Sequence, residues 1–150
     1  MDIGSKLGYP ASALSNFSPY LFVFEGVECA SMEGLLQSFK INEVHIQVEV
    51  CKLVGIHAKR RGQKRNEVWK QVQRLWWKGE EYDRHGREYQ ELLDWAFDAL
   101  SENIFFQKAL LASGDSTLTH SIGSSDRTKT VLTENEFCSR LGKIRIRLQK

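Results

Sequence analysis

The chain has 150 residues, of which 41% are hydrophobic, 11% aromatic and 27% charged, and it contains only two prolines. This composition excludes disordered, collagen-like and low-complexity proteins, and the length fits one compact domain over residues 1–150. Lysines and arginines number 21 against 19 acidic residues, which leaves a net charge of +2. The total charge therefore does not indicate a nucleic-acid partner, and only the distribution of charge can do so.

Residues that bind metals or form disulfides are few and scattered. The three cysteines form no CxxC pair, and the four histidines form no HxxxH pair. We therefore expect no metal site, no cofactor and no disulfide framework, as is typical of a protein in the reducing cytoplasm. The first residues lack the apolar core of a signal peptide, and no stretch approaches the ~18 apolar residues that a membrane span needs, so we expect no membrane partner.

The first third of the chain predicts a loop, a strand and a helix. Residues 1–20 are rich in turn formers but carry apolar side chains, which favours an ordered loop. Residues 21–27 have the β-branched and aromatic content of a short strand, with a turn or bulge at Glu25 and Gly26. Ser31 is a suitable N-cap for a helix over residues 32–41, with Glu33 in its first turn.

Beyond residue 42 the pattern is mainly helical, with Gly55 and Gly62 as weak points or ends. Further helices are expected over residues 66–79 with Asn66 as the cap, over 87–100, over 103–111, and over 133–148 with a capping box of Thr133 and Glu136. Residues 115–130 are rich in Ser, Thr, Gly and Asp, with a short strand expected at 117–122. At about 16 residues this segment is long for a passive connection, and we interpret it as a candidate binding loop.

Charge is segregated along the chain. Residues 52–78 hold nine Lys or Arg against one acid, whereas residues 80–102 hold eight acids against two arginines. One interpretation is a pair of solvated helix faces. The other is that the basic side chains bind a phosphorylated ligand, while neighbouring indoles either stack on its base or pack in the core. The residues concerned are Lys59, Arg60, Arg61, Lys64 and Arg65, supported by Arg140, Lys143, Arg145 and Arg147, with Trp69, Trp76 and Trp77 among them.

The predicted helix over residues 32–41 carries the most informative pattern. Glu33, Gln37 and Lys40 are spaced so that an acid, an amide and an amine share one stripe of the helix. This stripe is either the exposed side of an amphipathic helix or the lining of a cleft. In a cleft, burial would raise the pKa of the carboxyl and lower that of the amine, which suits general acid or base catalysis and nucleophilic attack on a carbonyl or anomeric carbon.

An ordered set of motifs resembles the NADAR superfamily (NAD and ADP-ribose associated), whose founding members are YbiA-like N-glycosidases. The motifs are Leu-Ser-Asn-Phe at 14–17, Phe-Glu-Gly-Val-Glu-Cys at 24–29, Ser-Met-Glu-Gly-Leu-Leu-Gln-Ser-Phe-Lys at 31–40, Leu-Trp-Trp-Lys-Gly at 75–79, Leu-Leu-Ala-Ser-Gly-Asp at 110–115 and Thr-Val-Leu-Thr-Glu at 130–134. The chain is most similar to the short bacterial and phage branch, and the similarity covers nearly its whole length.

The resemblance implies an α+β, predominantly helical fold with a few short strands and an enzyme that hydrolyses N-glycosidic bonds. The implied substrate joins a ribose phosphate or ADP-ribose moiety to a base, either in a free ribosylaminopyrimidine of riboflavin synthesis or as ADP-ribosylated guanine in nucleic acid. Glu33 matches the acid or base of the family, Lys40 the lysine that forms an imine with the opened sugar, and Gln37 an orienting amide. Asn16 and Phe17 match the loop that lines the pocket, and no cofactor is implied.

One departure from the family pattern concerns the second carboxylate. Many members carry a carboxylate and then Trp-Gly-x-Gly after the Leu-Ala-Thr-Gly element, whereas this chain has Thr-His-Ser at 119–121 and Ser-Ser-Asp at 124–126. We expect Asp126 to substitute as a third catalytic residue, or His120 to carry a proton in the pocket, because the ordinary pKa of histidine is near 6.5. Either residue could instead be an ordinary part of the loop.

Two other functions stay open from the sequence. The chain could bind or sequester an ADP-ribose-like or nucleotide-like ligand without turnover, or it could bind nucleic acid through its basic helices alone. The motifs do not reveal which base is cleaved, whether the target is a free metabolite or a nucleic acid, or the oligomeric state.

Overall fold

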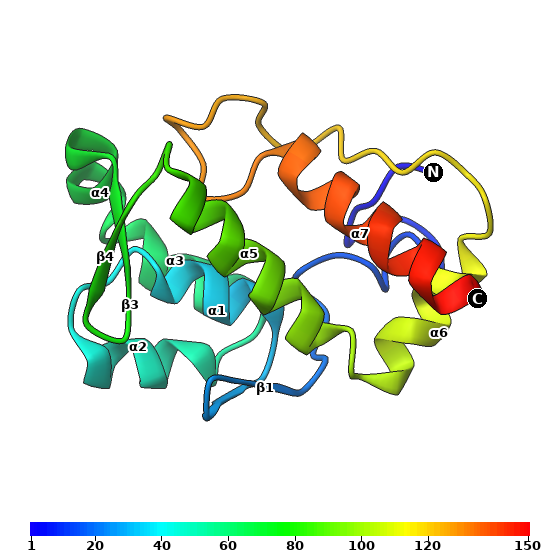
Figure 1. The fold of residues 1–150 in the computed structure, drawn as a ribbon, viewed down its shortest axis with the longest axis horizontal. Coiled ribbons are helices and arrows are strands. Elements are labelled where there is room, and N and C mark those ends of the chain that lie inside the picture. Colours follow the sequence, from blue (N-terminus) through cyan, green and yellow to red (C-terminus); the bar gives the residue numbers. More distant parts are fainter.

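The computed structural model describes all 150 residues and places seven helices around two small hairpins (Figure 1). The strands are β1 (Phe22–Phe24), β2 (Val27–Cys29), β3 (Arg74–Trp77) and β4 (Glu80–Asp83). The helices are α1 (Met32–Ser38), α2 (Val44–Cys51), α3 (Gly55–Gln63), α4 (Asn66–Val72), α5 (Arg87–Leu100), α6 (Ile104–Ala112) and α7 (Glu134–Gln149). The expected α+β, predominantly helical fold is confirmed.

Several element boundaries follow directly from local sequence signals. The side chain of Ser31 accepts a hydrogen bond from the backbone N–H of Gly34, so it caps α1 as expected. Thr133 and Glu136 form the expected capping box at the start of α7. The bounds of α5 agree with the prediction, because its apolar residues repeat at helical spacing and face inward.

The expected helix over residues 66–79 is wrong in its second half. Helix α4 ends at Val72, Gln73 adopts a left-handed conformation, and residues 74–77 pair with 80–83 as an antiparallel hairpin. Lys78 and Gly79 both have positive φ, which is the geometry of a tight two-residue hairpin turn. The β-forming residues of β3 and this turn therefore override the helical spacing of Leu75 and Trp76.

Two other expectations differ in detail. Helix α1 ends at Ser38 rather than at residue 41, and the short strand expected at 117–122 is reduced to one isolated bridge between Asp2 and Thr119. Beyond β1, the chain turns at Glu25 and Gly26 into a second strand, β2, and forms a hairpin. The segment between α6 and α7 runs over the top of the molecule in Figure 1, shown in yellow and orange.

The core is a single cluster of 26 buried apolar residues. Helix α5 contributes six of them and lies across the middle of the molecule, next to α7 and in front of α1 (Figure 1). Helix α1 supplies Met32, Leu35 and Leu36 to the core from one side. Its other side is therefore free to carry polar residues, which is where the stripe of Glu33, Gln37 and Lys40 lies. None of the helices has the length and apolar character that crossing a bilayer requires.

Candidate active site

A cavity of about 630 Å³ lies against the polar side of α1. Its walls come from four parts of the chain: the loop before β1, α1, the α3–α4 region and the segment between α6 and α7. The lining residues include Asn16, Phe17, Glu33, Gln37, Lys40, Ile56, Lys59, Asn66 and His120, together with Lys6, Ile122, Ser124 and the run from Lys129 to Leu132. The structure therefore brings together six of the site residues expected from the sequence: Asn16, Phe17, Glu33, Gln37, Lys40 and His120.

The start of α1 is fixed from two sides. The backbone N–H of Glu33 donates to the carbonyl of Asn16 at 3.0 Å, which ties the Ser-Asn-Phe loop to the first turn of the helix. The Ser31 hydroxyl donates to the carbonyl of Leu53 at 2.9 Å. A Cβ at Gly34 would lie 2.7 Å from the same Leu53 oxygen, so only glycine lets α1 approach the end of α2 this closely. These contacts hold the polar stripe against the cavity.

The Glu33 carboxylate has one hydrogen-bond donor, the amide of Gln37, at 2.6 Å. Burial raises the pKa of Glu33, although the bond from Gln37 and the positive charges of Lys40 and Lys59 act in the opposite direction. A larger share of this carboxyl is therefore protonated near neutral pH than in an exposed glutamate. The group can act as a general acid as well as a base.

The oxygen of the Gln37 amide is unusual because it is buried and accepts no hydrogen bond. It lies against the backbone of α3 at Gly62, where an added Cβ would come 1.7 Å from this oxygen. The amide therefore keeps its NH₂ group on Glu33 because Gly62 leaves room for the oxygen on the other side.

The Lys40 amine is nearly buried, with 8% of the residue exposed, and its Nζ donates to the Asn66 Oδ1 at 2.7 Å. Burial lowers the pKa of Lys40 to about 8, against the effect of Glu33, and the charges of Lys70 and Lys59 lower it further. A substantial fraction of the amine is then neutral at a slightly alkaline pH. A neutral amine is the form that attacks a carbonyl or anomeric carbon.

His120 lies on the wall formed by the segment between α6 and α7. Its Nδ1 contacts the carbonyl of Ile3 at 2.8 Å, and since a carbonyl only accepts, this nitrogen carries the proton in the neutral ring. The backbone N–H of His120 donates to the Glu134 carboxylate at 2.9 Å. The ring is thus held in one orientation at the cavity wall, with Nε2 as the acceptor nitrogen.

The cavity has a positive lining. Lys6, Lys59 and Lys129 are exposed and come from three separate parts of the chain, and Glu33 is the only acid among the lining residues. Together with Lys40, these lysines suit an anionic ligand such as a phosphate. No group of three or more His, Cys, Asp or Glu residues forms a cluster that could hold a metal ion.

Four of the other residues expected to bind substrate do not line the cavity. Trp69 and Trp77 are buried in the core with 1% and 2% exposed, and Trp76 packs against the core from β3, where its backbone N–H donates to the carbonyl of Phe39. Arg61 points to Glu49 on α2, with 3.4 Å between Nη2 and the carboxylate. Trp76 and Trp77 belong to β3 rather than to the expected helix, and Trp69 faces the core from α4, so none of the three indoles lines the cavity.

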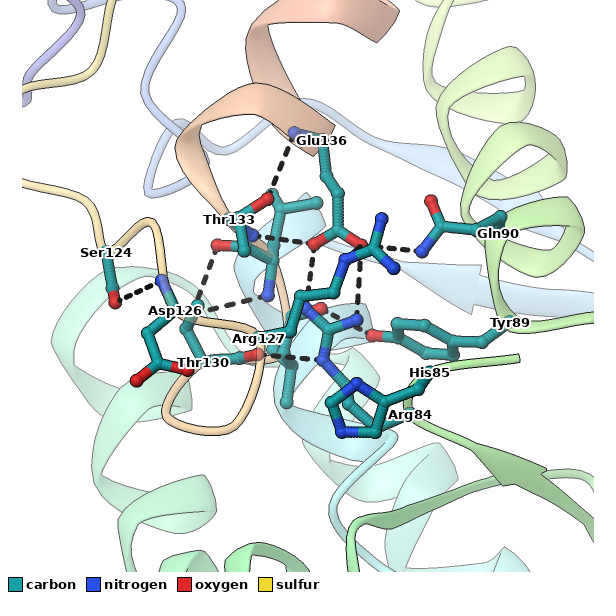
Figure 2. Close-up of polar contacts among 12 residues, drawn as sticks. Arg84, His85, Tyr89, Gln90, Ser124, Asp126, Arg127, Thr130, Thr133 and Glu136 are labelled. Carbon is teal, nitrogen blue, oxygen red and sulfur yellow. Dashed lines mark hydrogen bonds and ion pairs between the residues drawn. The ribbon is translucent and has the colours of Figure 1, made fainter. Parts of the chain in front are cut away.

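Asp126, expected as a catalytic carboxylate, is also outside the cavity. Its side chain is exposed and accepts hydrogen bonds from the backbone N–H and the hydroxyl of Thr128, at 2.9 and 2.7 Å. These bonds from Thr128 hold the pKa of Asp126 below its usual range. Figure 2 shows the carboxylate at the turn, directed away from the polar network beside it. The geometry is that of a turn residue, and His120 occupies the cavity wall instead.

A buried ion pair supports the cavity wall from behind. Arg84 makes two bonds to the Glu136 carboxylate, at 2.7 and 3.1 Å, and its Nε donates to the carbonyl of Thr130 at 2.9 Å (Figure 2). The Tyr89 hydroxyl donates to the carbonyl of Val131 at 2.6 Å. Because Thr130 and Val131 line the cavity, this network fixes that wall relative to α5 and α7.

The C-terminal arginines expected to support phosphate binding instead bond residues of neighbouring helices and loops. Arg140 pairs with Asp94 at 2.9 Å, Arg147 pairs with Asp98 at 3.2 Å, and Arg145 bonds the Ser113 hydroxyl at 2.8 Å. These contacts join α7 to α5 and to the end of α6. The cations that line the cavity are instead four lysines, Lys6, Lys40, Lys59 and Lys129.

Sequence reasoning missed several lining residues. Asn66 was expected to cap a helix, but it is the first residue of α4 and its side chain bonds Lys40. Lys6 and Lys129 lie in loops far apart in the sequence, so no local pattern indicates that they line the same cavity. The only signal for Lys129 is its place beside the Thr-Val-Leu-Thr-Glu motif at 130–134. Arg84, which pairs with Glu136 behind the cavity wall, lies in the acidic stretch of residues 80–102, and nothing in the local sequence indicates that it is buried.

Comparisons with known proteins show the family and the fold of the chain. The family model described as bacteriophage protein GP30.3 matches residues 8–146. An uncharacterised 17.1 kDa protein of Enterobacteria phage T4, from the Gp30-rIII intergenic region, is 34% identical over 147 residues, which cover 97% of this chain and 96% of the phage protein. The NMR structure of the E. coli protein YbiA superposes with a TM-score of 0.63 over 99% of this chain and 84% of YbiA, at 15% identity. The resemblance to the NADAR superfamily is confirmed.

Proposed function

The chain belongs to the bacteriophage GP30.3 family, a NADAR-like family, and from this premise we propose that it is an N-glycosidase. The proposed enzyme hydrolyses the bond between the C1 atom of a ribose phosphate or ADP-ribose moiety and a nitrogenous base. The proposed catalytic residues are Glu33 as the acid and base and Lys40 as the nucleophile. Asn16, Phe17, Gln37 and His120 would contact or orient the substrate.

One observation carries the proposal. The Glu33 carboxyl on α1 and the Lys40 amine just after its end both line one cavity, and burial moves the pKa of each toward its neutral form. Protein charges that serve only stability are paired so that they stay ionised, as Arg84 and Glu136 are. An acid with a raised pKa and an amine with a lowered pKa in one cavity are instead the groups that proton transfer and imine formation require.

The first step opens the sugar. Protonated Glu33 gives its proton to the ring oxygen, which breaks the bond between that oxygen and C1 and leaves a C1 iminium with the base nitrogen. The neutral Nζ of Lys40 then adds to C1. A proton passes from Nζ to the base nitrogen, the bond between C1 and the base breaks, and an imine between Lys40 and C1 remains.

The second step restores the enzyme. The Glu33 carboxylate takes a proton from water as the water oxygen adds to C1, which gives a carbinolamine. The proton of the new hydroxyl then passes to Nζ, the bond between C1 and Nζ breaks, and C1 becomes an aldehyde while Lys40 returns to its neutral amine. The products are the free base and the open-chain sugar, which closes again. Water is the only co-reactant. The Gln37 amide favours this cycle because it holds Glu33 at 2.6 Å in one orientation while the charge of the carboxyl changes.

Substrate binding would use the rest of the lining. The unpaired amines of Lys6, Lys59 and Lys129 suit the negative charge of a phosphate or diphosphate. Phe17, which packs beside Gly55, and Ile56 supply flat and apolar surface for a base. This division of the cavity supports a ligand that combines a phosphorylated ribose with a planar base.

The test is incubation of the protein with ADP-ribosylated guanosine and, separately, with ribosylaminopyrimidine phosphate. Chromatography would measure the free base. Wild type is expected to release base from at least one compound, and cyanoborohydride should trap a sugar adduct on Lys40 that mass spectrometry locates. Lys40→Ala should lose both signals. Lys108→Ala, which removes an exposed lysine of α6 away from the cavity, serves as the matched control and should retain them.

Two outcomes would contradict the proposal in different ways. Tight binding of both compounds without product, retained by Lys40→Ala, would favour a module that sequesters the ligand. Binding only to nucleic acid, with a steep salt dependence and no effect of Glu33→Gln, would favour a nucleic-acid-binding protein.

A further inference from the structure

The Lys40 amine is held by a chain of two side chains that reaches into the core. Its Nζ donates to the Asn66 Oδ1 at 2.7 Å, and the same oxygen accepts a hydrogen bond from the Trp69 Nε1 at 3.3 Å. Asn66 lines the cavity, whereas Trp69 has 1% of its surface exposed and cannot touch a ligand. We propose that Trp69 is a positioning residue for the Lys40 amine and that it acts through Asn66.

The chemistry of the three groups explains the direction of this effect. An asparagine side chain presents an oxygen acceptor on one edge and an NH₂ donor on the other. A lysine ammonium only donates, and so does an indole N–H. The Trp69 N–H therefore fixes the Asn66 amide with its oxygen toward Lys40. Without this bond the amide can turn and present its NH₂ group to the amine.

The position of Trp69 in the fold makes it a rigid support. It lies on α4 within the core cluster, one turn after Asn66, so indole and amide share one face of the helix. Lys40 lies just beyond the C-terminal end of α1, where its backbone N–H still bonds the carbonyl of Gln37 but its long side chain extends away from the helix toward α4. The amine thus depends on a partner from α4 to stay at the cavity wall.

Asn66 also affects the charge of the amine. An acceptor on Nζ stabilises the ammonium and so opposes the lowering of the Lys40 pKa by burial. The charged groups that face Lys40 are Glu33 on α1, which favours the ammonium, and Lys59 on α3 and Lys70 on α4, which disfavour it. If Trp69 orients Asn66, loss of its N–H alone should lower the pKa of Lys40 below about 8.

The experiment compares two tryptophans that differ in their partners. Trp69→Phe removes the N–H that binds Asn66. Trp77→Phe is the matched control, because Trp77 is equally buried, with 2% exposed, and its Nε1 donates to the Glu25 carboxylate at 2.8 Å, away from the cavity. The pKa of Lys40 is read from the NMR titration of ¹³Cε-labelled lysine, with Lys40→Arg to assign the signal.

We expect Trp69→Phe to lower the pKa of Lys40 and to slow cyanoborohydride trapping of ribose 5-phosphate on Lys40 roughly tenfold at pH 9, where the amine is largely neutral in both proteins. Trp77→Phe should change neither. Asn66→Asp should raise the pKa, since it places a negative charge on the amine. Asn66→Ala should lower it, and addition of Trp69→Phe to Asn66→Ala should have no further effect.

The proposal fails if Trp69→Phe and Trp77→Phe change the titration of Lys40 alike, or if Trp69→Phe still shifts it in the Asn66→Ala background. If Trp69→Phe does not fold, the pair Asn66→Ala and Asn66→Asp decides: equal titrations of Lys40 in both would overturn the role of Asn66. The catalytic value of this positioning depends on the proposed function, but the titration does not. If wild type released no base, the proposed glycosidase activity would be wrong, and the titration of Lys40 would still test the role of Trp69.

Discussion

The Arg84–Glu136 pair and the Glu33–Lys40 pair lie on opposite sides of Thr130 and Val131. The Arg84 network bonds this stretch from behind, and Glu33 and Lys40 line the cavity in front of it. The two pairs differ in how many hydrogen-bond partners their polar atoms have. Behind this stretch, both oxygens of Glu136 accept bonds from Arg84, and the backbone N–H of Thr133 and the amide of Gln90 add further donors. In front of it, Glu33 has one donor, and Gln37 leaves a buried oxygen without a partner.

This difference in partners decides the direction in which the pKa of each carboxyl moves. Burial would raise the pKa of Glu136, but the bonds from Arg84, Thr133 and Gln90 outweigh it and bring the value to about 2. Burial dominates at Glu33 and raises its pKa. A fully satisfied pair is a structural tie that stays ionised, whereas an under-satisfied carboxyl beside a buried amine can exchange protons. Glu136 therefore suits a structural role, and Glu33 suits proton transfer.

The largest effect is expected at the structural tie. Glu136→Ala leaves Arg84 charged and unpaired in the core, and we expect a loss of about 3–5 kcal/mol in the free energy of unfolding. Urea unfolding would measure it. Glu102→Ala is the control, since Glu102 is exposed at the end of α5, and should change stability by no more than about 0.5 kcal/mol. Similar losses in both would contradict the assigned role of Glu136.

The pH dependence of stability should separate the two groups. Glu136 has a lowered pKa of about 2 in the folded state, so its contribution is complete above the unfolded value near 4.3 and is lost as the pH falls toward 2. Lys40 has a lowered pKa of about 8, so its penalty is complete below pH 8 and disappears as the pH rises toward the unfolded value near 10.4.

Thermal unfolding over pH 2–11 tests both windows. Lys40→Met should flatten the alkaline change in stability and leave the acid change in place. An alkaline profile identical to that of wild type would show that the Lys40 amine is not destabilised by burial.

A smaller effect is expected where Gly62 makes room for Gln37. Gly62→Ala places a Cβ 1.7 Å from the Gln37 Oε1, and we expect a loss of about 1–3 kcal/mol together with lower base release. Gly142→Ala is the control: a Cβ there meets nothing within 4 Å, so this variant should gain about 0.5–1 kcal/mol from helix propensity alone. Equal gains in both helices would show that the Gln37 amide adapts freely.

The smallest effect is expected at Asp126. Asp126→Ala removes only the bonds to Thr128 at an exposed turn, so stability should fall by about 0.5–1 kcal/mol and base release should change less than about twofold. Base-release kinetics and urea unfolding would check this. A large loss of activity with unchanged stability would restore Asp126 as the second catalytic carboxylate and argue that the loop moves onto the cavity when substrate binds.

The sequence by itself determined the elements whose signals are local. The Ser31 cap, the capping box of Thr133 and Glu136, and the inward face of α5 depend on residues within a few positions of one another. The shared stripe of Glu33, Gln37 and Lys40 is equally local, because helical geometry alone places them on one side. The ordered motifs added the fold class, since they span nearly the whole chain.

Only the tertiary structure decided that this stripe faces a cavity rather than solvent, and which residues from distant segments line that cavity with it. Asn66, Lys6 and Lys129 come from separate segments to line one cavity with Lys40 and Glu33. Trp69 on α4 and Trp77 on β3 face the core rather than a ligand. Such meetings depend on packing between elements and on the burial that packing imposes. Local spacing carries no information about either, and burial is what moves the pKa of Glu33 up and that of Lys40 down.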